Sequence, residues 1–445
     1  TGKSHAYIMA AVVWSLFSNQ TSPIILSTST IALQSAVVEE YIPQISNILL
    51  AHRITIRPLT YVVRKGKSHY VCDARLRTYF SSIRNLDNPK NADLIDLLSD
   101  LMCAGCNDID LSEYPLTRYV KDRICVVGRC APSCPHFEDC RYRTHTRQCM
   151  HGRYDIQITN HNYVLANLLN TKDGKGELLP DYKLIIFDEA HKLLDAARQM
   201  YGQEIARAEV PELLASIQIQ RIPSKQGRQS VTRCMETLEK QNACLFDTLH
   251  TVADRDDEQD RFRNLICGHA RHLILKMIDQ LTQLPALCRT HGDGRMRAKY
   301  HNLNVACTDL CQRFDYLLQH RDLLYWIGGR EGGERICTLP IHLGEKLCED
   351  MWDRSLPYIL TSGTLSVGGH FDLVCRDLGI DQLDPERIGT ITTPSPFDYK
   401  SNTLLYIPHT MPFPDIRNEI YIEAVANQIL NLIHATDGHT LILFT

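Results

Sequence analysis

Short apolar runs that alternate with helical patterns constrain the fold of this chain most strongly. The segments "YDIQIT" and "KLIIF" have the composition of buried strands, and "NHNYVLANLL" between them has helical spacing. Near the start, "PIILSTSTIALQ" predicts a strand over residues 24–27 that leads through a polar turn into a helix. A strand, a helix and a second strand in this order are typical of a parallel sheet covered by helices. We therefore expect an α/β fold.

Length and composition limit the class of protein. The chain has 445 residues, of which 44% are hydrophobic, enough for two to four domains of about 100–200 residues each. Its most apolar stretch, residues 6–17, is shorter than the roughly 20 residues that a membrane-spanning helix requires, and no cleavable signal precedes it. A net charge of −4 excludes a protein that is basic throughout. We expect a cytoplasmic protein with no membrane contact.

Two regions interrupt the alternation of strands and helices. Residues 61–153 are rich in loops and cysteine, with one clear helix over residues 92–102. Residues 195–325 are almost purely helical in pattern, and "LYWIGGREGGERICTLPI" then predicts a hairpin around Gly332 and Gly333. Short strands are predicted to return at "YILTS", "TLLYIP" and "TLILFT". The two regions are therefore interpreted as insertions.

The string "TGKS" at residues 1–4 has the form of the last part of a phosphate-binding loop. It precedes an apolar helical stripe that is predicted to begin just after Ser4. In a complete loop, backbone amides surround the phosphates, the lysine neutralises their charge and the hydroxyl binds Mg²⁺. The tripeptide Gly-Lys-Ser by itself also occurs in ordinary turns. We predict a nucleotide site at Thr1, Gly2, Lys3 and Ser4.

Adjacent acids follow the apolar run "KLIIF", at Asp188 and Glu189. The carboxyl ends of parallel strands line the crevice where α/β sheets bind ligands, so Asp188 is predicted to face Lys3 and Ser4. Asp188 would bind Mg²⁺ together with Ser4, and Glu189 would position and polarise the attacking water. The alternative is a helix N-terminus that simply carries acids. With Lys3 and Ser4 upstream in the right order, ATP hydrolysis is the better interpretation.

The chain contains seventeen cysteines, and eight of them lie between Cys72 and Cys149. Because we expect a cytoplasmic protein, in which thiols stay reduced, these cysteines do not indicate a disulfide framework. Cys72 and the trio in "CAPSCPHFEDC" make a candidate four-thiolate site, formed by Cys72, Cys130, Cys134 and Cys140. One distant cysteine with a tight trio beside a proline fits a [4Fe–4S] cluster better than zinc, which prefers paired C-x2-C knuckles. Cys125 and Cys149 remain alternative ligands. Zinc remains an alternative metal.

Basic residues are concentrated in the same region. Between Arg118 and Arg153 there are eight Lys or Arg residues against three acids, with aromatic residues interleaved. A second basic group comprises Arg64, Lys65, Lys67 and Arg75. A solvated positive face is one interpretation, but cations beside aromatic rings suit a phosphate backbone and stacked bases. We predict a nucleic-acid surface here.

Several strings resemble motifs of superfamily 2 helicases. "DEAH" ends at His191, which would link the nucleotide site to a second motor domain. "LTSGTLS" resembles the Ser-Ala-Thr motif that couples hydrolysis to strand movement, with Gly363 in place of alanine, and its polar residues are Thr361, Ser362 and Thr364. "ILSTSTIALQ" resembles the motif that contacts the DNA backbone through Thr28, Ser29, Thr30 and Gln34. Further similar strings are "ITNHNYVLANLL", "LPIHLGEKLCEDMW" and "SPFDY".

Together with the cysteine-rich insertion, these strings resemble the XPD/DinG family of iron–sulfur DNA helicases, especially its bacterial DinG branch. The resemblance implies a RecA-like P-loop motor at residues 1–60 and 154–194, with an iron–sulfur insertion at 61–153. It also implies a helical arch with a return segment at 195–350 and the first part of a second RecA-like motor at 351–445. The family commonly places four residues between the first two cysteines of the trio, whereas Cys130 and Cys134 are separated by three.

The resemblance implies a monomeric ATP-dependent helicase that moves 5′ to 3′ on single-stranded DNA and unwinds forked or structured duplexes in repair or replication. Its cofactors would be ATP, Mg²⁺ and a structural [4Fe–4S] cluster. The P-loop glycines and the C-terminal motifs are absent, so we expect a fragment of a larger enzyme. The alternative is an ATP-gated nucleic-acid-binding protein, or a nuclease-associated DinG relative, that does not unwind.

Overall fold

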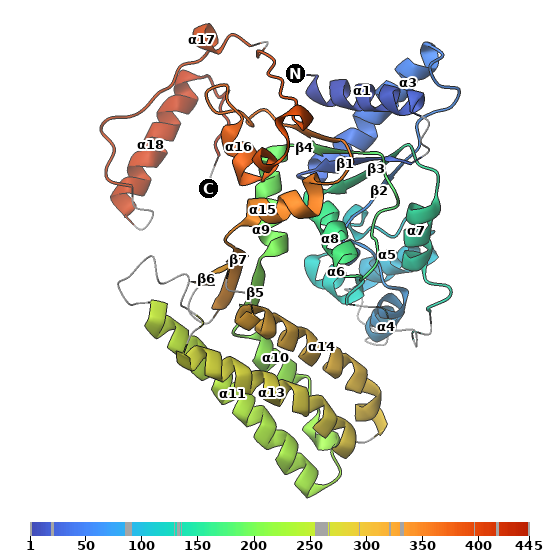
Figure 1. Ribbon diagram of the computed structural model, residues 1–445, viewed down its shortest axis with the longest axis vertical. Helices are drawn as coiled ribbons and strands as arrows, with labels where there is room; N and C mark the ends of the chain where they lie inside the picture. The colour runs from blue at the N-terminus through green and yellow to red at the C-terminus, as the bar shows by residue number, and fades with distance from the viewer. Residues whose placement is uncertain are drawn as a thin grey trace. The chain divides into compact units, whose positions relative to one another are not determined.

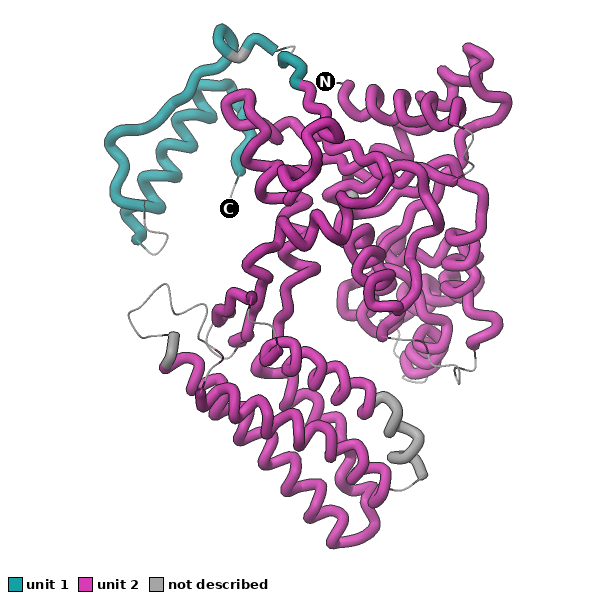
Figure 2. The backbone as a smooth tube through the Cα atoms, in the orientation of Figure 1, with its two compact units in different colours: residues 1, 392–445 teal, residues 2–391 magenta. Residues whose placement is uncertain are grey.

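The structure is a computed structural model of the chain. It describes residues 2–18, 22–84, 91–128, 130, 134, 136–253, 266, 268–292, 294–319, 322–329, 333–395, 397–414 and 418–443. The chain divides into two compact units, residues 2–391 and residues 392–445 with residue 1 (Figure 2). Each unit is described by itself.

The first half of the larger unit contains four strands and nine α-helices in the described residues. They are α1 (Lys3–Phe17), β1 (Ile24–Thr28), α2 (Ile31–Ala36), α3 (Ile42–Ala51), β2 (Tyr61–Val63), α4 (Asp73–Arg84), α5 (Ala92–Cys103), α6 (Arg118–Ile124), α7 (Arg141–His151), β3 (Ile156–Asn160), α8 (His161–Lys172), β4 (Leu184–Asp188) and α9 (Leu193–Tyr201). The predicted strand at residues 24–27, the strand–helix–strand unit and the helix at residues 92–102 are confirmed.

The second half begins with a small strand and continues into long helices. The elements are β5 (Gln203–Ala206), α10 (Glu209–Ala215), α11 (Lys225–Ala253), α13 (Gly268–His291), α14 (Gly294–Gln319), β6 (Leu323–Gly328), β7 (Arg335–Pro340), α15 (Leu343–Leu347), β8 (Tyr358–Thr361) and α16 (Asp372–Asp377). Strands β6 and β7 pair antiparallel, which confirms the predicted hairpin, although Gly332 lies outside the described residues. Strand β5 adds to β7 and was not predicted.

Five parallel strands form the main sheet, in the order β2-β3-β1-β4-β8. Alternate residues of each strand point to opposite faces. Ile24 and Leu26 pack with α1 and α3 on one face, while Ile25 and Phe187 pack with α8 and α9 on the other. The result is the three-layered α/β arrangement visible in Figure 1, with helices on both faces of a buried parallel sheet. The mixed α/β fold with a parallel sheet is as predicted and consistent with a RecA-like motor.

One strand lies elsewhere than expected. The string "YILTS" was assigned to the first part of a second motor domain, but β8 pairs in parallel with β4, with Asp188 opposite Thr361. A strand belongs to the sheet that satisfies its backbone hydrogen bonds, and here that is the first sheet. The assignment of residues 351–361 to a second motor was therefore wrong. The remaining module boundaries stay a prediction.

The two insertions have hydrophobic cores of their own. In residues 61–153, helices α4, α5 and α6 bury a cluster that includes Leu76, Leu98 and Ile124. In the second region, α11, α13 and α14 lie side by side as a bundle (Figure 1), with Phe246 and Phe314 fully buried in it. No helix in the described parts of the chain combines the length and apolar character that crossing a bilayer demands.

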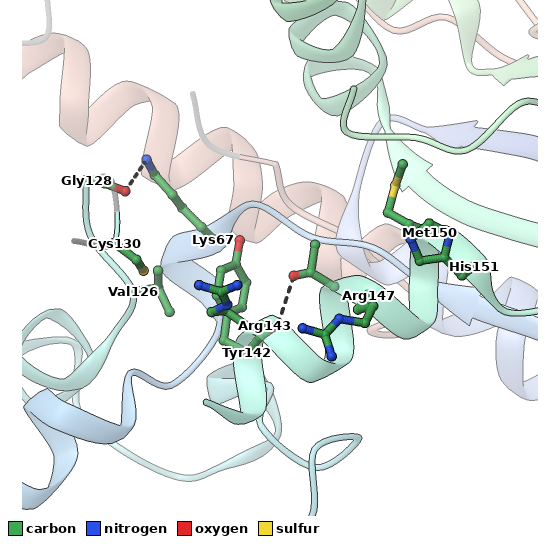
Figure 3. Close-up of a pocket in the computed structure, with 10 residues that line it drawn as sticks. Lys67, Val126, Gly128, Cys130, Tyr142, Arg143, Arg147, Met150 and His151 are labelled. Atoms are coloured by element: carbon green, nitrogen blue, oxygen red, sulfur yellow. Dashed lines mark hydrogen bonds between the residues drawn. The ribbon is translucent and has the colours of Figure 1, made fainter. Parts of the chain in front are cut away.

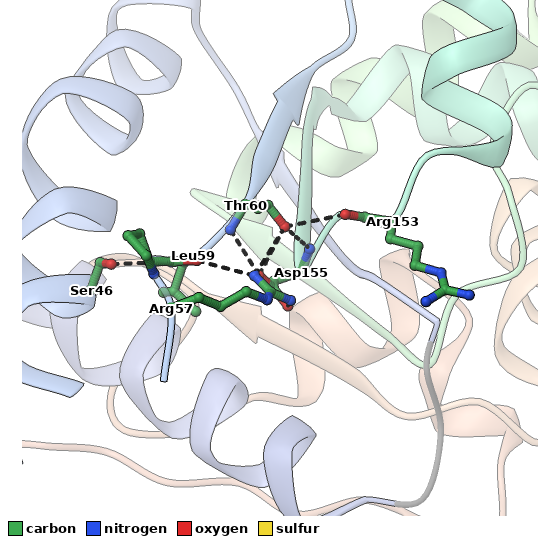
Figure 4. A network of polar contacts seen from close by, with 7 residues as sticks. Ser46, Arg57, Leu59, Thr60, Arg153 and Asp155 are labelled. Carbon is green, nitrogen blue, oxygen red and sulfur yellow. Dashed lines mark hydrogen bonds and ion pairs between the residues drawn. The ribbon is translucent and has the colours of Figure 1, made fainter. Parts of the chain in front are cut away.

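A polar network links the two chain segments that flank the first insertion. Asp155, just before β3, accepts hydrogen bonds from Arg57 at 2.7 and 2.9 Å, and from the backbone and hydroxyl of Thr60 at 2.7 and 2.9 Å (Figure 4). Thr60 directly precedes β2. Since the network ties residues just ahead of two neighbouring strands, it sets where β2 and β3 begin to pair.

The smaller unit contains two helices in its described residues, α17 (Tyr399–Asn402) and α18 (Glu419–Ala435). The strand predicted at "TLLYIP" is wrong, because residues 403–408 are not in regular structure. Residues 440–443 of "TLILFT" are also not a strand, and the last two lie outside the described residues. A strand needs a neighbour to share its hydrogen bonds. No such neighbour lies among the described residues of this unit.

Candidate nucleotide site and cysteine cluster

Helix α1 begins at the string "TGKS". Gly2 is its N-cap, with φ of 72°. This left-handed conformation favours glycine over residues with a side chain. The helix starts at Lys3, slightly earlier than the predicted start after Ser4, so both residues belong to its first turn. A helix N-terminus attracts anions, which suits a phosphate site. Thr1 lies outside the described residues.

Lys3 meets the acids that follow β4. Its Nζ lies 3.1 Å from Asp188 Oδ1 and 2.6 Å from Glu189 Oε1. Burial alone would lower the pKa of Lys3, but the hydrogen bonds and negative charges of Glu189 and Asp188 raise it above its ordinary value. The predicted meeting of the first turn with the acidic pair is therefore present in the structure. The catalytic roles of these residues stay a prediction.

Tyr7 is a neighbour of the site that no sequence motif singles out. It lies one turn after Ser4 and is 8% exposed. Burial and the negative charge of Asp188 raise the pKa of Tyr7, while the Ser4 hydroxyl opposes this. Ser4 and Asp188 thus both act on one phenol, which places the two predicted Mg²⁺ ligands in the same neighbourhood. Both supply oxygen atoms, the donors that Mg²⁺ prefers.

The backbone at Glu189 is strained. Glu189 has φ of 52°, in the left-handed region that residues with side chains rarely adopt, and its amide donates to Asp188 Oδ1 at 3.0 Å. Burial alone would raise the pKa of Glu189, but the hydrogen bond and charge of Lys3, with help from Ser362, lower it. Glu189 is therefore held as a carboxylate. Strain of this kind concentrates at functional sites.

The end of β8 reaches the same carboxylate. Ser362 Oγ donates to Glu189 Oε2 at 3.0 Å and contacts His191 Nδ1 at 2.8 Å. His191 Nδ1 is itself 3.2 Å from Glu189 Oε2, and the Thr364 amide donates to Ser362 Oγ at 3.2 Å. Thr361 pairs with Asp188 in the sheet. The three polar residues predicted to couple hydrolysis to movement thus lie beside the acidic turn.

The four residues predicted to contact DNA are not equally accessible. Thr28 and Gln34 are buried, at 0% and 3% exposure. Thr30 is exposed, but its hydroxyl caps α2 by accepting from the Leu33 amide at 3.2 Å. Ser29 is partly exposed. Of the four, Ser29 and Thr30 are thus the ones that reach solvent, and their contact with DNA stays a prediction.

An ion pair brings two predicted cluster ligands together. Asp73 directly follows Cys72, and Arg141 directly follows Cys140. The backbone amide of Arg141 donates to the Asp73 carboxylate at 3.0 Å, and the Arg141 side chain donates to it at 2.6 and 2.8 Å. Arg141 also donates to the carbonyl oxygens of Leu101 and Ala104. No local sequence motif indicates this pair. It fixes Cys72 and Cys140 next to each other despite their separation along the chain.

The other two cysteines of the set belong to the same neighbourhood. Burial raises the pKa of the Cys130 thiol, and the negative charges of Cys140, Cys72 and Cys134 raise it further. All four thiols are free. Among the described residues, no group of three or more His, Cys, Asp or Glu side chains is arranged to hold a metal ion. The four sulfur atoms fit a thiolate-bound cofactor by their chemistry, and the [4Fe–4S] assignment stays a proposal.

The two alternative ligands, Cys125 and Cys149, are buried and contact other groups. Cys125 is 5% exposed within the core of the insertion, and its thiol donates to the carbonyl oxygen of Asp122 at 3.6 Å. Cys149 is 1% exposed and contacts His145 Nε2 at 3.5 Å. Burial raises the pKa of the Cys149 thiol, which opposes thiolate formation.

Next to Cys130 lies an open pocket of about 410 Å³ (Figure 3). Its charged lining comes from Lys67, Arg143 and Arg147, with Tyr142 and Met150 as larger apolar members. Arg143 also stacks on Phe137, and Arg123 lies 4.4 Å from the ring centre of Tyr119. The predicted mixture of cations and aromatic rings is therefore present on α6 and α7.

Most residues of the second basic group make contacts within the protein and do not form an exposed positive surface. Arg64 is 3% exposed and donates to Gln157 at 3.2 Å. Lys65 pairs with Asp110, and Arg75 donates to the carbonyl oxygens of Arg123 and Asp122. Lys67 differs, because it lines the pocket beside Cys130.

Comparison with known proteins gives one consistent result. No family model matches the chain. The chain is 25% identical over 423 residues to the ATP-dependent DNA helicase YoaA of Escherichia coli strain K12, covering 93% of the chain and 62% of that protein. It is 24% identical over 457 residues to the ATP-dependent DNA helicase DinG of Photobacterium profundum, covering 92% of the chain and 63% of that protein. The chain is thus similar over most of its length to proteins named as DNA helicases of the YoaA and DinG kinds.

The DinG-type relatives are longer than this chain, which spans less than two thirds of the length of either helicase. A third relative, the 3′-5′ exonuclease DinG of Bacillus subtilis, is 23% identical over 505 residues, and the chain covers 51% of it. All three similarities extend over most of this chain.

Proposed function

We propose that the protein is an ATP-dependent DNA helicase that couples ATP hydrolysis to movement on single-stranded DNA and to duplex unwinding. The observation that carries this proposal is the contact of Lys3 with Asp188 and Glu189 at the carboxyl ends of the parallel strands. A ligand crevice is expected at that edge of an open α/β sheet. The names of the two helicase relatives support DNA as the partner.

Each residue of the site has a chemical task in this proposal. The first turn of α1 and Lys3 bind the phosphates of ATP, and Ser4 and Asp188 would hold Mg²⁺, which would neutralise phosphate charge. Glu189, kept as a carboxylate by its lowered pKa, orients the attacking water and accepts its proton. Lys3 leaves Glu189 for the phosphates when ATP binds, because a triphosphate carries more charge than one carboxylate.

The cysteine-rich region has a structural task. Cys72, Cys130, Cys134 and Cys140 would hold a [4Fe–4S] cluster, which would brace a region that is rich in loops. The cations and aromatic rings of α6 and α7 would contact the DNA at the point where strands separate. We further propose 5′-to-3′ movement, a preference for forked or structured duplexes in repair or replication, a monomeric state and a cytoplasmic location.

The decisive experiment measures ATP hydrolysis and unwinding of a forked duplex by the full-length protein. Lys3→Ala and Glu189→Gln are expected to abolish DNA-stimulated hydrolysis. Lys175→Ala is the matched control, because Lys175 is exposed and pairs with Asp173 away from the site. Retained turnover in both site variants would exclude these residues from the mechanism.

A second candidate is an ATP-gated nucleic-acid-binding protein, or a nuclease-associated relative, that does not unwind. The name of the Bacillus subtilis relative favours it. The same assay separates the two: ATP-dependent unwinding supports the helicase, whereas ATP-dependent DNA binding or degradation without unwinding supports the alternative.

A further inference from the structure

His161 occupies a buried position between two functional segments. It is the first residue of α8, directly after β3, and is 3% exposed. Its Nδ1 lies 2.7 Å from Ser27 Oγ, and its ring centre lies 5.6 Å from that of Phe187 in an edge-on arrangement. Ser27 and Phe187 are opposite each other in the parallel pairing of β1 and β4. The ring therefore contacts both central strands near their carboxyl ends.

These two contacts lead to the two motifs of the proposed motor. Ser27 immediately precedes residues 28–34, the segment predicted to contact DNA. Phe187 immediately precedes Asp188 and Glu189, which contact Lys3. A single side chain thus touches the residue before each motif. Such an arrangement can pass a displacement of one segment to the other, because packed side chains move together.

The second ring nitrogen is the unexplained feature. Within the described parts of the chain, His161 Nε2 is buried and has no hydrogen-bond partner. Burial lowers the pKa of His161 to about 4, while the backbone of Glu189 and the charge and backbone of Asp188 oppose this. The ring is therefore neutral at pH 7, and one of its nitrogens carries a hydrogen.

Ser27 can satisfy Nδ1 by donating its hydroxyl hydrogen. In that tautomer Nε2 carries the hydrogen, and the groups that influence the ring from the acidic turn, the backbone of Glu189 and Asp188, are acceptors. A buried polar group without a partner costs about 1–3 kcal/mol. A phenylalanine would fill the space without that cost. The backbone of Glu189 and of Asp188 already lies close enough to affect the ring, so a small shift would let one of these carbonyl groups accept its hydrogen bond.

We propose that His161 is a positioning residue that transmits DNA binding from the segment after Ser27 to the acidic turn at Asp188 and Glu189. This inference rests on the proposed function. DNA binding shifts Ser27 and the ring, and Nε2 then donates to a backbone carbonyl of the turn, which sets Glu189 for hydrolysis. The turn is suited to such control because Glu189 already holds a strained backbone conformation.

The test compares His161→Phe, which keeps an aromatic ring but no hydrogen bonds, with His161→Gln, which keeps a donor and an acceptor. ATP hydrolysis is measured in the full-length protein with and without single-stranded DNA, together with KM for ATP, DNA affinity and melting temperature. For His161→Phe we expect DNA stimulation to fall by about 5-fold or more. Basal hydrolysis, KM for ATP and DNA affinity are expected to stay unchanged, and His161→Gln to recover much of the stimulation. Ser27→Ala is expected to act in the same direction.

His342→Phe serves as the control, because His342 is exposed and pairs with Glu345. Full stimulation of His161→Phe in an assay where the native protein is stimulated overturns this inference and leaves the proposed function intact. Equal loss of basal and stimulated hydrolysis in both His161 variants, with a lower melting temperature, also overturns it, since that pattern indicates packing alone. A native protein that shows no DNA-stimulated hydrolysis removes the inference and the proposed function together.

Discussion

Ser362 donates a 3.0 Å hydrogen bond to one oxygen of Glu189, whose other oxygen lies 2.6 Å from Lys3 Nζ. Two segments far apart in the sequence therefore meet at one carboxylate. Lys3 belongs to the proposed phosphate site, and Ser362 belongs to the string after β8. Because the backbone of Glu189 is strained, small shifts of either partner can change the orientation of its side chain. This contact supplies a physical path between the proposed phosphate site and the end of β8.

Replacement of Ser362 by alanine is expected to separate hydrolysis from unwinding. Ser362→Ala removes the donor to Glu189 but leaves Lys3 and Asp188 in place, so ATP hydrolysis is expected to survive in part. A hydrogen bond to a charged group contributes roughly 1.5–3 kcal/mol, so we expect strand separation per ATP to fall about tenfold. Unwinding and phosphate release are measured on the same forked substrate. Ser366→Ala, in the same string, is the control, and equal losses in both variants would contradict the role of Ser362.

Loss of the Asp73–Arg141 ion pair is expected to weaken cofactor retention. Asp73→Asn leaves Arg141 without its charged partner, at a site where Asp73 is 7% exposed. Removing one partner of such a buried pair destabilises the fold by about 3 kcal/mol. Here the destabilised segments are those that carry Cys72 and Cys140. We expect lower iron content and faster loss of absorption near ~400 nm on exposure to air. Asp122→Asn, which alters an exposed acid on α6, provides the comparison. Unchanged iron content in Asp73→Asn would show that the pair does not position the ligands.

Substitution of one proposed cluster ligand is expected to affect unwinding more than hydrolysis. Cys134→Ser replaces a proposed thiolate ligand with a hydroxyl that binds iron poorly, so the region proposed to contact the fork would lose its brace. The proposed nucleotide site at Lys3 has contacts of its own, so we expect ATP hydrolysis to survive in part. Iron analysis, unwinding and hydrolysis are compared with Cys106→Ser, whose thiol donates to Gln148 at 3.5 Å. Tightly held zinc and no iron in the native protein would overturn the cluster assignment.

The sequence predicted those parts of the fold that depend on local patterns. The runs at β1, β3 and β4 are apolar enough to identify as buried strands, and the order of strand and helix then implies parallel pairing. That pairing also brings Asp188 toward the first turn of α1, because the carboxyl ends of parallel strands share one edge. The contact of Lys3 with the acids was therefore within reach of sequence reasoning.

Features that depend on contacts between residues far apart in the chain could not be predicted from the sequence. Strand β8 follows the whole helical bundle in the sequence, and nothing in "YILTS" indicates that it pairs with β4. Strand β5 is only four residues long and owes its conformation to β7. The bond between Ser27 and His161 and the ion pair between Asp73 and Arg141 join residues that no local motif connects. Conversely, "TLLYIP" has the composition of a strand but is not one, because composition alone supplies no pairing partner.

The network at Asp155 predicts a specific dependence of stability on pH. Burial alone would raise the pKa of Asp155, but the hydrogen bonds and charge of Arg57 and the donors of Thr60 lower it below its ordinary value. A carboxylate whose folded pKa is lowered stabilises the fold above the unfolded value of about 3.9 and loses that contribution as pH falls through the folded pKa. We therefore expect Asp155→Asn to reduce the free energy of unfolding at pH 7 by about 1–3 kcal/mol, and the difference from the native protein to shrink below about pH 4. Urea unfolding at several pH values measures this, with Asp173→Asn as the control for an exposed acid. A difference of the same size at pH 3 and pH 7 would mean that the charge of Asp155 does not hold the starts of β2 and β3 together.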